Sequence, residues 1–282
     1  MKVLVLGASG MIGSTMLRVL SATTGWEVFG AVRDPDVKQF FSKDISEALQ
    51  VGFGDGDSVV RLLGQVLPNV VINCMGLTKH KPDADDPLIA IPINALMPHR
   101  LAGLCKLIGA RLIHISTDCV FSGDKGNYVE DDFPDARDVY GKSKALGELI
   151  YPHTITLRIS TIGHELQGKY GLLDWFLSQE GRCKGFAQAI FSGLPTVVFA
   201  QVIRDVVIPY TELSGLYHVA AKPINKFDLL KLIAEVYGKN IEIVRDDQLV
   251  IDRSLDSSKF KLATSYVAPE WPEFIKTMKS YK

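Results

Sequence analysis

The chain has 282 residues, 47% of them apolar, and its 31 basic and 32 acidic residues leave a formal net charge of −1. A chain this apolar can bury a large core, which excludes general disorder, and its length suits two domains or one elaborated α/β domain. The balanced charge argues against nucleic acid as the main partner.

Apolar runs and helical periodicity alternate along the first part of the chain. Residues 2–6 form a continuous apolar run, which is typical of a strand covered on both faces, and apolar residues then recur at helical spacing over 11–20. Further strands are predicted at 28–32, 70–74, 112–116 and 154–159, and further helices at 59–66, 94–108 and 142–150. This order predicts an α/β fold with a doubly wound parallel sheet of the Rossmann type.

The second part of the chain is less regular. Residues 160–215 are rich in glycine and aromatic residues, and a predicted helix at 226–237 and a strand near 241–244 follow. We therefore expect a first domain over residues 1–159, to which later segments return, and a smaller C-terminal α/β domain over residues 160–282.

Three glycines follow the first predicted strand with the spacing G-x-x-G-x-x-G. A dinucleotide pyrophosphate needs backbone N–H groups at a helix N-terminus with no Cβ in the way, and a glycine-rich turn between a strand and a helix supplies them. The motif predicts cofactor binding by Gly7, Ser9, Gly10, Met11, Ile12 and Gly13.

The end of the second strand indicates which cofactor is preferred. Arg33 follows this strand and could pair with the 2′-phosphate of NADP, whereas an acidic residue there would bind the ribose of NAD. Asp34 would take that second role if the strand ended one or two residues away from the expected place. We expect NADP(H), with NAD(H) as the alternative.

Two polar clusters in the middle of the chain suit carbonyl chemistry. Tyr140 and Lys144 are four residues apart and share a helix face, where an ammonium would lower the pKa of a phenol toward the range of an acid–base catalyst. Ser116, Thr117 and Asp118 follow a predicted strand, at the sheet edge where α/β proteins bind ligands. A hydroxyl there could hold a substrate carbonyl, or it could simply satisfy the backbone at the end of the strand.

Together these motifs resemble the extended short-chain dehydrogenase/reductases. The motifs concerned are the glycine turn, residues 73–76 (NCMG), 116–121 (STDCVF) and 140–144 (YGKSK), and Gly147-Glu148. Three more stretches are similar to the dTDP-4-dehydrorhamnose reductase family: residues 126–130 (GNYVE), 215–219 (GLYHV) and 253–259 (RSLDSSK). The resemblance covers nearly the whole chain.

The resemblance implies an NADPH-dependent oxidoreductase that reduces a keto group on a nucleotide-activated deoxysugar, a precursor of polysaccharides. It implies that Tyr140 donates the proton, that Lys144 lowers the pKa of Tyr140 and binds the nicotinamide ribose, and that Thr117 holds the substrate oxygen. It extends the cofactor site to Asp55, Cys74, Met75 and Gly76. Residues 160–282 would hold the nucleotide sugar, and the implied substrate contacts are Thr78, His80, Asp118, Cys119, Thr161 and Arg253.

Departures from the family pattern fall where the sugar would lie. Cys119 stands where the family has an aromatic residue, Thr161 stands where it has a tryptophan, and residues 79–82 (KHKP) are more basic. GDP-fucose synthases, which epimerise and reduce, carry a cysteine at the place of Cys119 and a second proton-transfer residue in the region of His164. The alternatives are therefore an epimerase-reductase that uses Cys119, a plain reductase with room for a bulkier sugar, and a non-enzymatic NADP-binding regulatory subunit.

The remaining features concern metals, membranes and location. The four cysteines, at positions 74, 105, 119 and 183, are widely spaced, so we expect free thiols in a reducing compartment and no metal site. The N-terminal apolar run is too short for a signal peptide, and no run approaches the roughly 18 apolar residues of a membrane span. We expect a cytoplasmic protein whose partner is a nucleotide-sugar substrate, without nucleic acid or membrane, and a homodimer is compatible with the sequence.

Overall fold

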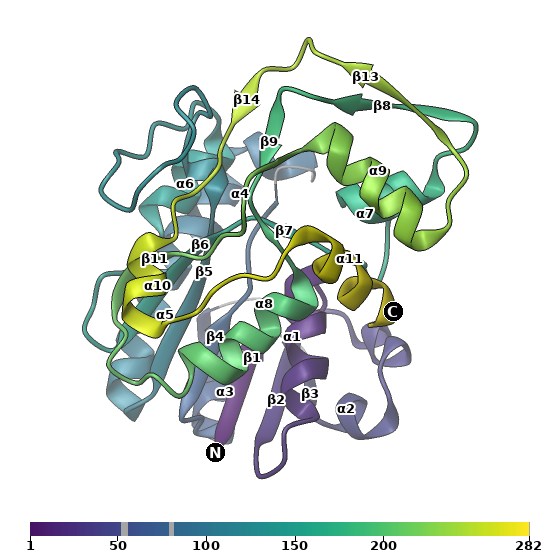
Figure 1. The fold of residues 1–282 in the computed structure, drawn as a ribbon. Coiled ribbons are helices and arrows are strands. Elements are labelled where there is room, and N and C mark those ends of the chain that lie inside the picture. The colour runs from purple at the N-terminus through teal and green to yellow at the C-terminus, as the bar shows by residue number, and fades with distance from the viewer. Residues whose placement is uncertain (52–55, 79–81, 282) are drawn as a thin grey trace.

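The computed structural model describes residues 1–51, 56–78 and 82–281, and a seven-stranded sheet lies at its centre (Figure 1). All neighbouring strands run parallel, in the order β3-β2-β1-β4-β5-β6-β11. The strands are β1 (Lys2–Leu6), β2 (Glu27–Val32), β3 (Leu49–Val51), β4 (Val70–Asn73), β5 (Arg111–Thr117), β6 (Thr154–Ile159) and β11 (Gly215–His218). The predicted doubly wound parallel sheet is confirmed, while β3, three residues long, is not anticipated by the sequence pattern.

Helices on both faces of the sheet explain why β1 is apolar throughout. Leu4 and Leu6 belong to one core cluster, which includes α3 (Gly56–Val66) and α5 (Met97–Ile108). Val3 and Val5 belong to the other cluster, which includes α1 (Met11–Ser21) and helices from the C-terminal part. All four side chains are fully buried, so no position of the strand is left for a polar residue.

The last helix of the chain completes the core on the α1 face. α8 (Thr196–Val202) packs on α1, and α11 (Trp271–Ser280) packs on α8 and α9 (Lys226–Tyr237). Trp271, Phe274, Ile275 and Met278 of α11 are buried in the cluster that also holds Val3 and Val5. The two ends of the chain therefore share one core.

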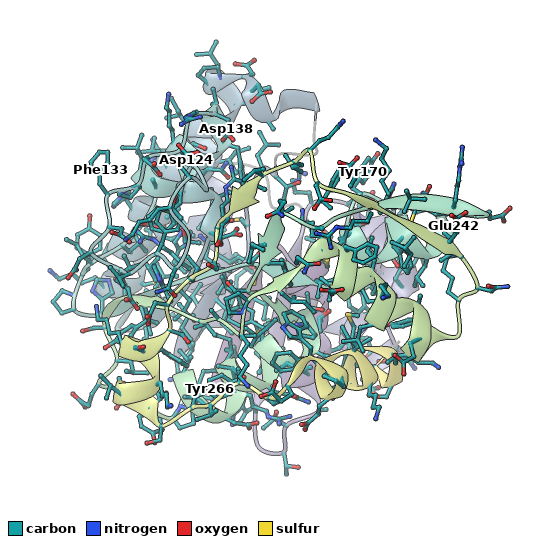
Figure 2. All side chains as sticks on the ribbon, turned by 45° about the horizontal axis from the view of Figure 1, so that its top comes forward. Asp124, Phe133, Asp138, Tyr170, Glu242 and Tyr266 are labelled. Carbon is teal, nitrogen blue, oxygen red and sulfur yellow. The ribbon has the colours of Figure 1, made fainter. Side chains whose placement is uncertain are left out.

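Two predicted helices have different bounds in the structure. The helix expected at 94–108 begins earlier, because α4 (Pro87–Ala90), the π-helical segment η3 (Ile91–Leu96) and α5 are continuous. The helix expected at 142–150 is α6 (Val139–Leu146). It begins early because the side chain of Asp138, labelled in Figure 2, accepts a hydrogen bond from the N–H of Gly141 at 2.6 Å.

One helix among the described residues, Pro87–Ile108, is long and apolar enough to cross a membrane by length and composition. Its inner face lies in the core of the sheet, where Leu101, Ala102 and Cys105 are buried. Packing against the sheet accounts for the apolar residues of this inner face, while Leu88, Ile91, Leu96 and Leu107 of the same helix are exposed.

Short elements form a second layer beyond the central sheet, at the top of the view in Figure 1. β8 pairs in parallel with β13, and β9 lies between β12 and β14. Figure 2 labels Tyr170 and Glu242 in this part of the molecule. The elements not yet given are η1 (Pro35–Phe40), α2 (Lys43–Glu47), η2 (Pro82–Asp85), η4 (Asp118–Val120), β7 (Thr161–Ile162), α7 (Leu172–Ser178), β8 (Arg182–Phe186), β9 (Ala189–Phe191), β10 (Leu194–Pro195), η5 (Ile203–Val207), β12 (Ile224–Asn225), β13 (Glu242–Asp246), β14 (Ile251–Asp252) and α10 (Ser258–Thr264).

Candidate active site

The turn between β1 and α1 has the shape that a dinucleotide requires. Gly7 has a φ of 76°, which favours glycine, and a Cβ on it would lie 3.0 Å from the backbone of Cys74 and Met75. A Cβ on Gly13 would clash with the carbonyl oxygen of Gly7. Gly10 caps α1 without a side-chain hydrogen bond, so the first backbone N–H groups of the helix face outward.

The neighbouring residues fit the same cofactor. Ser9 and Gly10 are exposed, and Met11 and Ile12 are partly exposed at the start of α1. Cys74, Met75 and Gly76 continue β4 directly beside the glycine turn, where the side-chain oxygen of Asn73 accepts a hydrogen bond from the N–H of Met75 at 3.1 Å. The structure thus brings the expected pyrophosphate and nicotinamide-ribose contacts to one edge of the sheet. Asp55, another expected contact, lies outside the described residues.

The end of β2 favours NADP. Arg33 follows Val32, the last residue of β2, and its side chain is exposed. Asp34 accepts a hydrogen bond from the N–H of Asp36 at 2.9 Å and caps η1. The carboxylate is therefore used in the turn, and the guanidinium is available for a 2′-phosphate.

Thr117, Tyr140 and Lys144 meet at the carboxyl end of β5. Thr117 is the last residue of β5, and its hydroxyl forms a hydrogen bond with the phenol of Tyr140 in the first turn of α6. The ammonium of Lys144 donates to the carbonyl of Ile115 at 2.8 Å. A Cβ on Gly141 would clash with the carbonyl oxygen of Cys119, which shows how closely α6 approaches the end of β5.

Burial sets the protonation of the tyrosine and the lysine. It raises the pKa of Tyr140 well above its usual value, and Cys119 and Asp118 act in the same direction. Burial lowers the pKa of Lys144 to about 8, while the charge of Glu148 opposes this shift. The expected lowering of the pKa of Tyr140 by Lys144 is not found in this structure, where the ammonium binds a backbone carbonyl. Tyr140 is a protonated phenol at neutral pH and can donate a proton.

Two of the expected substrate residues lie beside these groups. Arg253 donates to the carbonyl of Phe121 at 2.8 Å and to the sulfur of Cys119 at 3.7 Å. The N–H of Cys119 in turn donates to the hydroxyl of Thr117 at 3.1 Å. An arginine from the end of the chain thus faces the same edge of β5 as the tyrosine.

Asp118 also lies beside these groups, while the remaining expected substrate residues have other surroundings. The carboxylate of Asp118 accepts a hydrogen bond from the hydroxyl of Thr117 at 3.1 Å. Thr78 is exposed shortly after Gly76, and Thr161 lies on β7, paired with Leu194 of β10. His80 lies outside the described residues.

His164 is engaged away from Cys119. One ring nitrogen lies 3.2 Å from Asp174, and the other lies 3.0 Å from the hydroxyl of Tyr237. Both nitrogens therefore have partners in the second layer, which argues against a proton relay between His164 and Cys119.

A buried ion pair near Thr117, Tyr140 and Lys144 was not predicted from the sequence. Arg158 on β6 and Glu148 after α6 lie 2.7 Å apart, and their side chains are 3% and 10% exposed. The position of Arg158 within a mainly apolar strand indicates such a pair, because a buried arginine needs a buried partner.

Comparisons with known proteins identify the family of the chain. The profile of the RmlD substrate binding domain family matches residues 1–279. The chain is 33% identical over 267 residues to the probable low-salt glycan biosynthesis reductase Agl14 of Haloferax volcanii, covering 88% of this chain and 85% of that protein. It is 24% identical over 305 residues to a dTDP-4-dehydrorhamnose reductase of Aggregatibacter actinomycetemcomitans, covering 99% of both.

A solved structure shares the fold over the full length. It is the dTDP-4-dehydrorhamnose reductase of Bacillus anthracis in complex with NADP, with a TM-score of 0.81, 20% identity, and coverage of 100% of this chain and 99% of that one. The chain therefore belongs to the RmlD substrate binding domain family, a dTDP-4-dehydrorhamnose reductase family of the short-chain dehydrogenase/reductase type.

Proposed function

We propose that this protein is an NADPH-dependent reductase of a keto group on a nucleotide-activated deoxysugar, acting in the cytoplasm in the synthesis of polysaccharide precursors. The observation that carries the proposal is the meeting of Thr117, Tyr140 and Lys144 at the end of β5, on the same sheet edge as the glycine turn. The names of the relatives, which include a glycan biosynthesis reductase, support the substrate class.

The residues divide the reaction between them. NADPH held by the glycine turn, Arg33 and Lys144 would supply a hydride for the ketone carbon. The hydroxyl of Thr117 holds the ketone oxygen, and Tyr140 gives this oxygen its phenolic proton as negative charge develops there. Once the proton has left, the Lys144 ammonium would stabilise the phenolate, a role that it does not have while it binds the carbonyl of Ile115, and it would bind the nicotinamide ribose.

The pyrophosphate would rest on the N–H groups of residues 9–13, and the 2′-phosphate on Arg33. Arg253 would face the nucleotide sugar, and residues 160–282 would supply most of its remaining contacts. The site is assembled by segments from both parts of the chain, so the sugar would bind between them.

A direct test incubates the protein with NADPH and a panel of keto sugars activated by dTDP, UDP or GDP, and follows the loss of NADPH absorbance. Consumption with at least one of these sugars, absent in a Tyr140→Phe variant, is the expected result. No consumption with any keto sugar would reject the proposal.

The contact between Cys119 and Arg253 favours one alternative, an epimerase-reductase. A thiol beside a guanidinium and near Tyr140 could exchange protons next to the ketone. Incubation with substrate in D₂O without NADPH would then introduce deuterium at the carbons beside the ketone, and Cys119→Ser would abolish it. Absence of exchange would reject this alternative, which has to act without His164 because that ring is bonded to Asp174 and Tyr237.

A further inference from the structure

Glu148 extends the helix face that carries the catalytic tyrosine and lysine. Tyr140, Lys144 and Glu148 are spaced by four residues, and Glu148 lies two residues after the end of α6. Tyr140 and Lys144 therefore lie on one face of α6, about one turn apart, and Glu148 follows just beyond the C-terminal end of the helix.

Three successive residues of β5 bind these three side chains. The carbonyl of Ile115 accepts from Lys144 at 2.8 Å, the hydroxyl of Ser116 donates to Glu148 at 2.7 Å, and the hydroxyl of Thr117 bonds with Tyr140. The last three residues of β5 thus contact Lys144, Glu148 and Tyr140 in turn.

The carboxylate of Glu148 is itself fixed from the next strand. The Nε atom of Arg158 on β6 donates to one oxygen at 2.8 Å, and a terminal nitrogen of Arg158 donates to the other at 2.7 Å. The guanidinium also lies 4.9 Å from the centre of the Phe121 ring and 3.2 Å from a ring nitrogen of His218. Arg158 is therefore locked in place and presents Glu148 to α6 in one orientation.

Glu148 supplies the negative charge near the buried Lys144. The other titratable groups facing Lys144 are the Cys74 thiol after β4, the His114 imidazole on β5 and the Tyr140 phenol on α6. Burial raises the pKa of Cys74 to about 12 and holds the pKa of His114 well below its usual value, so both are neutral at pH 7. Tyr140 is neutral as well, because burial raises the pKa of its phenol.

We propose that Glu148 is a positioning residue for the reduction: bound to Ser116 and Arg158, it holds the catalytic face of α6 against the end of β5 and keeps a negative charge beside the Lys144 ammonium. This inference rests on the proposed function, since Lys144 matters only if Tyr140 transfers a proton. Its consequence is a dependence of turnover on pH that Glu148 sets without touching the substrate.

Glu148→Gln removes the charge with little change in shape: the amide oxygen can still accept from Ser116 and the Nε atom of Arg158, whereas the bond from the terminal nitrogen of Arg158 is lost. Without the carboxylate, Lys144 loses its proton at lower pH. The alkaline limb of the pH profile of kcat should therefore move down by about one pH unit, while KM for the nucleotide sugar stays within about twofold. An unchanged pH profile would overturn the proposal.

Glu47→Gln is the matched control. Lys43 and Glu47 form a pair with the same spacing and order as Lys144 and Glu148, but their side chains are 86% and 67% exposed. Solvent screens such a pair, so this variant should keep both the turnover and the pH profile of the wild-type protein.

Direct titration of Lys144 separates this inference from the proposed function. The signal of ¹³Cε-labelled lysine, assigned with Lys144→Arg, should titrate near pH 8 in the wild-type protein and at lower pH in Glu148→Gln. Glu148→Asp keeps the charge and should retain the wild-type midpoint, and a shift as large as in Glu148→Gln would overturn the proposal. A shifted midpoint in a protein that reduces no keto sugar would reject the proposed function and leave the link between Glu148 and Lys144 standing.

Discussion

The carboxyl ends of β1 and β5 lie on the same edge of the sheet, but the two parts of the candidate site that they form use different groups. At β1 the site is backbone: Gly7 and Gly13 leave no room for a Cβ, and the start of α1 offers N–H groups. At β5 the site is a set of side chains, Thr117, Tyr140 and Lys144, which is supported by buried charges. The proposed cofactor site after β1 therefore depends on backbone shape, and the proposed catalytic site after β5 depends on charged groups and protons. Different substitutions should impair cofactor binding and turnover.

Tyr140→Phe should have the largest effect, which should be on turnover and not on cofactor binding. It removes the proton and keeps the ring, so kcat should fall by about 10²–10⁴ while Kd for NADPH, measured by fluorescence titration, stays within about twofold. Wild-type turnover in this variant would show that the proposed catalytic site does not act through the phenol.

Arg33→Ala should act on the cofactor alone. Loss of a charge-assisted pair with the 2′-phosphate should raise Kd for NADPH by about 10- to 150-fold and leave Kd for NADH nearly unchanged. Arg61→Ala, on the exposed face of α3, serves as the control and should change neither value. Equal losses for both cofactors would assign Arg33 a different role.

Gly13→Ala should have a smaller effect on affinity than Arg33→Ala. The new Cβ displaces the carbonyl of Gly7, so Kd should rise about tenfold for NADPH and NADH alike, and Tm should fall because of the clash. The control is Gly64→Ala in α3, where a Cβ meets nothing within 4 Å and should stabilise the helix by about 0.5–1 kcal/mol. Unequal losses of affinity for NADPH and NADH in Gly13→Ala would contradict a purely steric role.

The glycine turn after β1 and the side-chain cluster after β5 could be predicted from the sequence to different extents, for physical reasons. The turn at Gly7–Gly13 is local, and a strand, a glycine spacing and a helix within 21 residues are enough to describe it. The Tyr140–Lys144 pair was found because four-residue spacing also has a local meaning. Local patterns also located β1, β2, β4, β5 and β6, since burial on both faces makes these strands mainly apolar, with buried exceptions such as His114, Thr156 and Arg158.

The contacts that the sequence did not reveal join distant parts of the chain. Arg253 and Cys119 are 134 residues apart, and Arg158 and His218 are 60 residues apart. Nothing in the sequence near Glu148 indicates that a strand arginine will bind both of its oxygens. The early start of α6 was missed because Asp138, two residues before Tyr140, was not recognised as its cap.

The position of α11 has a consequence for how this protein is made on the ribosome. The first strand, the glycine turn and α1 are synthesised early, but the side chains that complete their core, including Trp271 and Phe274, belong to the last helix. Until that helix has left the ribosomal exit tunnel, the nascent protein exposes part of an apolar face that the finished protein hides. Folding of the part that contains β1 and α1 is therefore coupled to the synthesis of α11, and a chain that stops before α11 would be a substrate for chaperones and proteases.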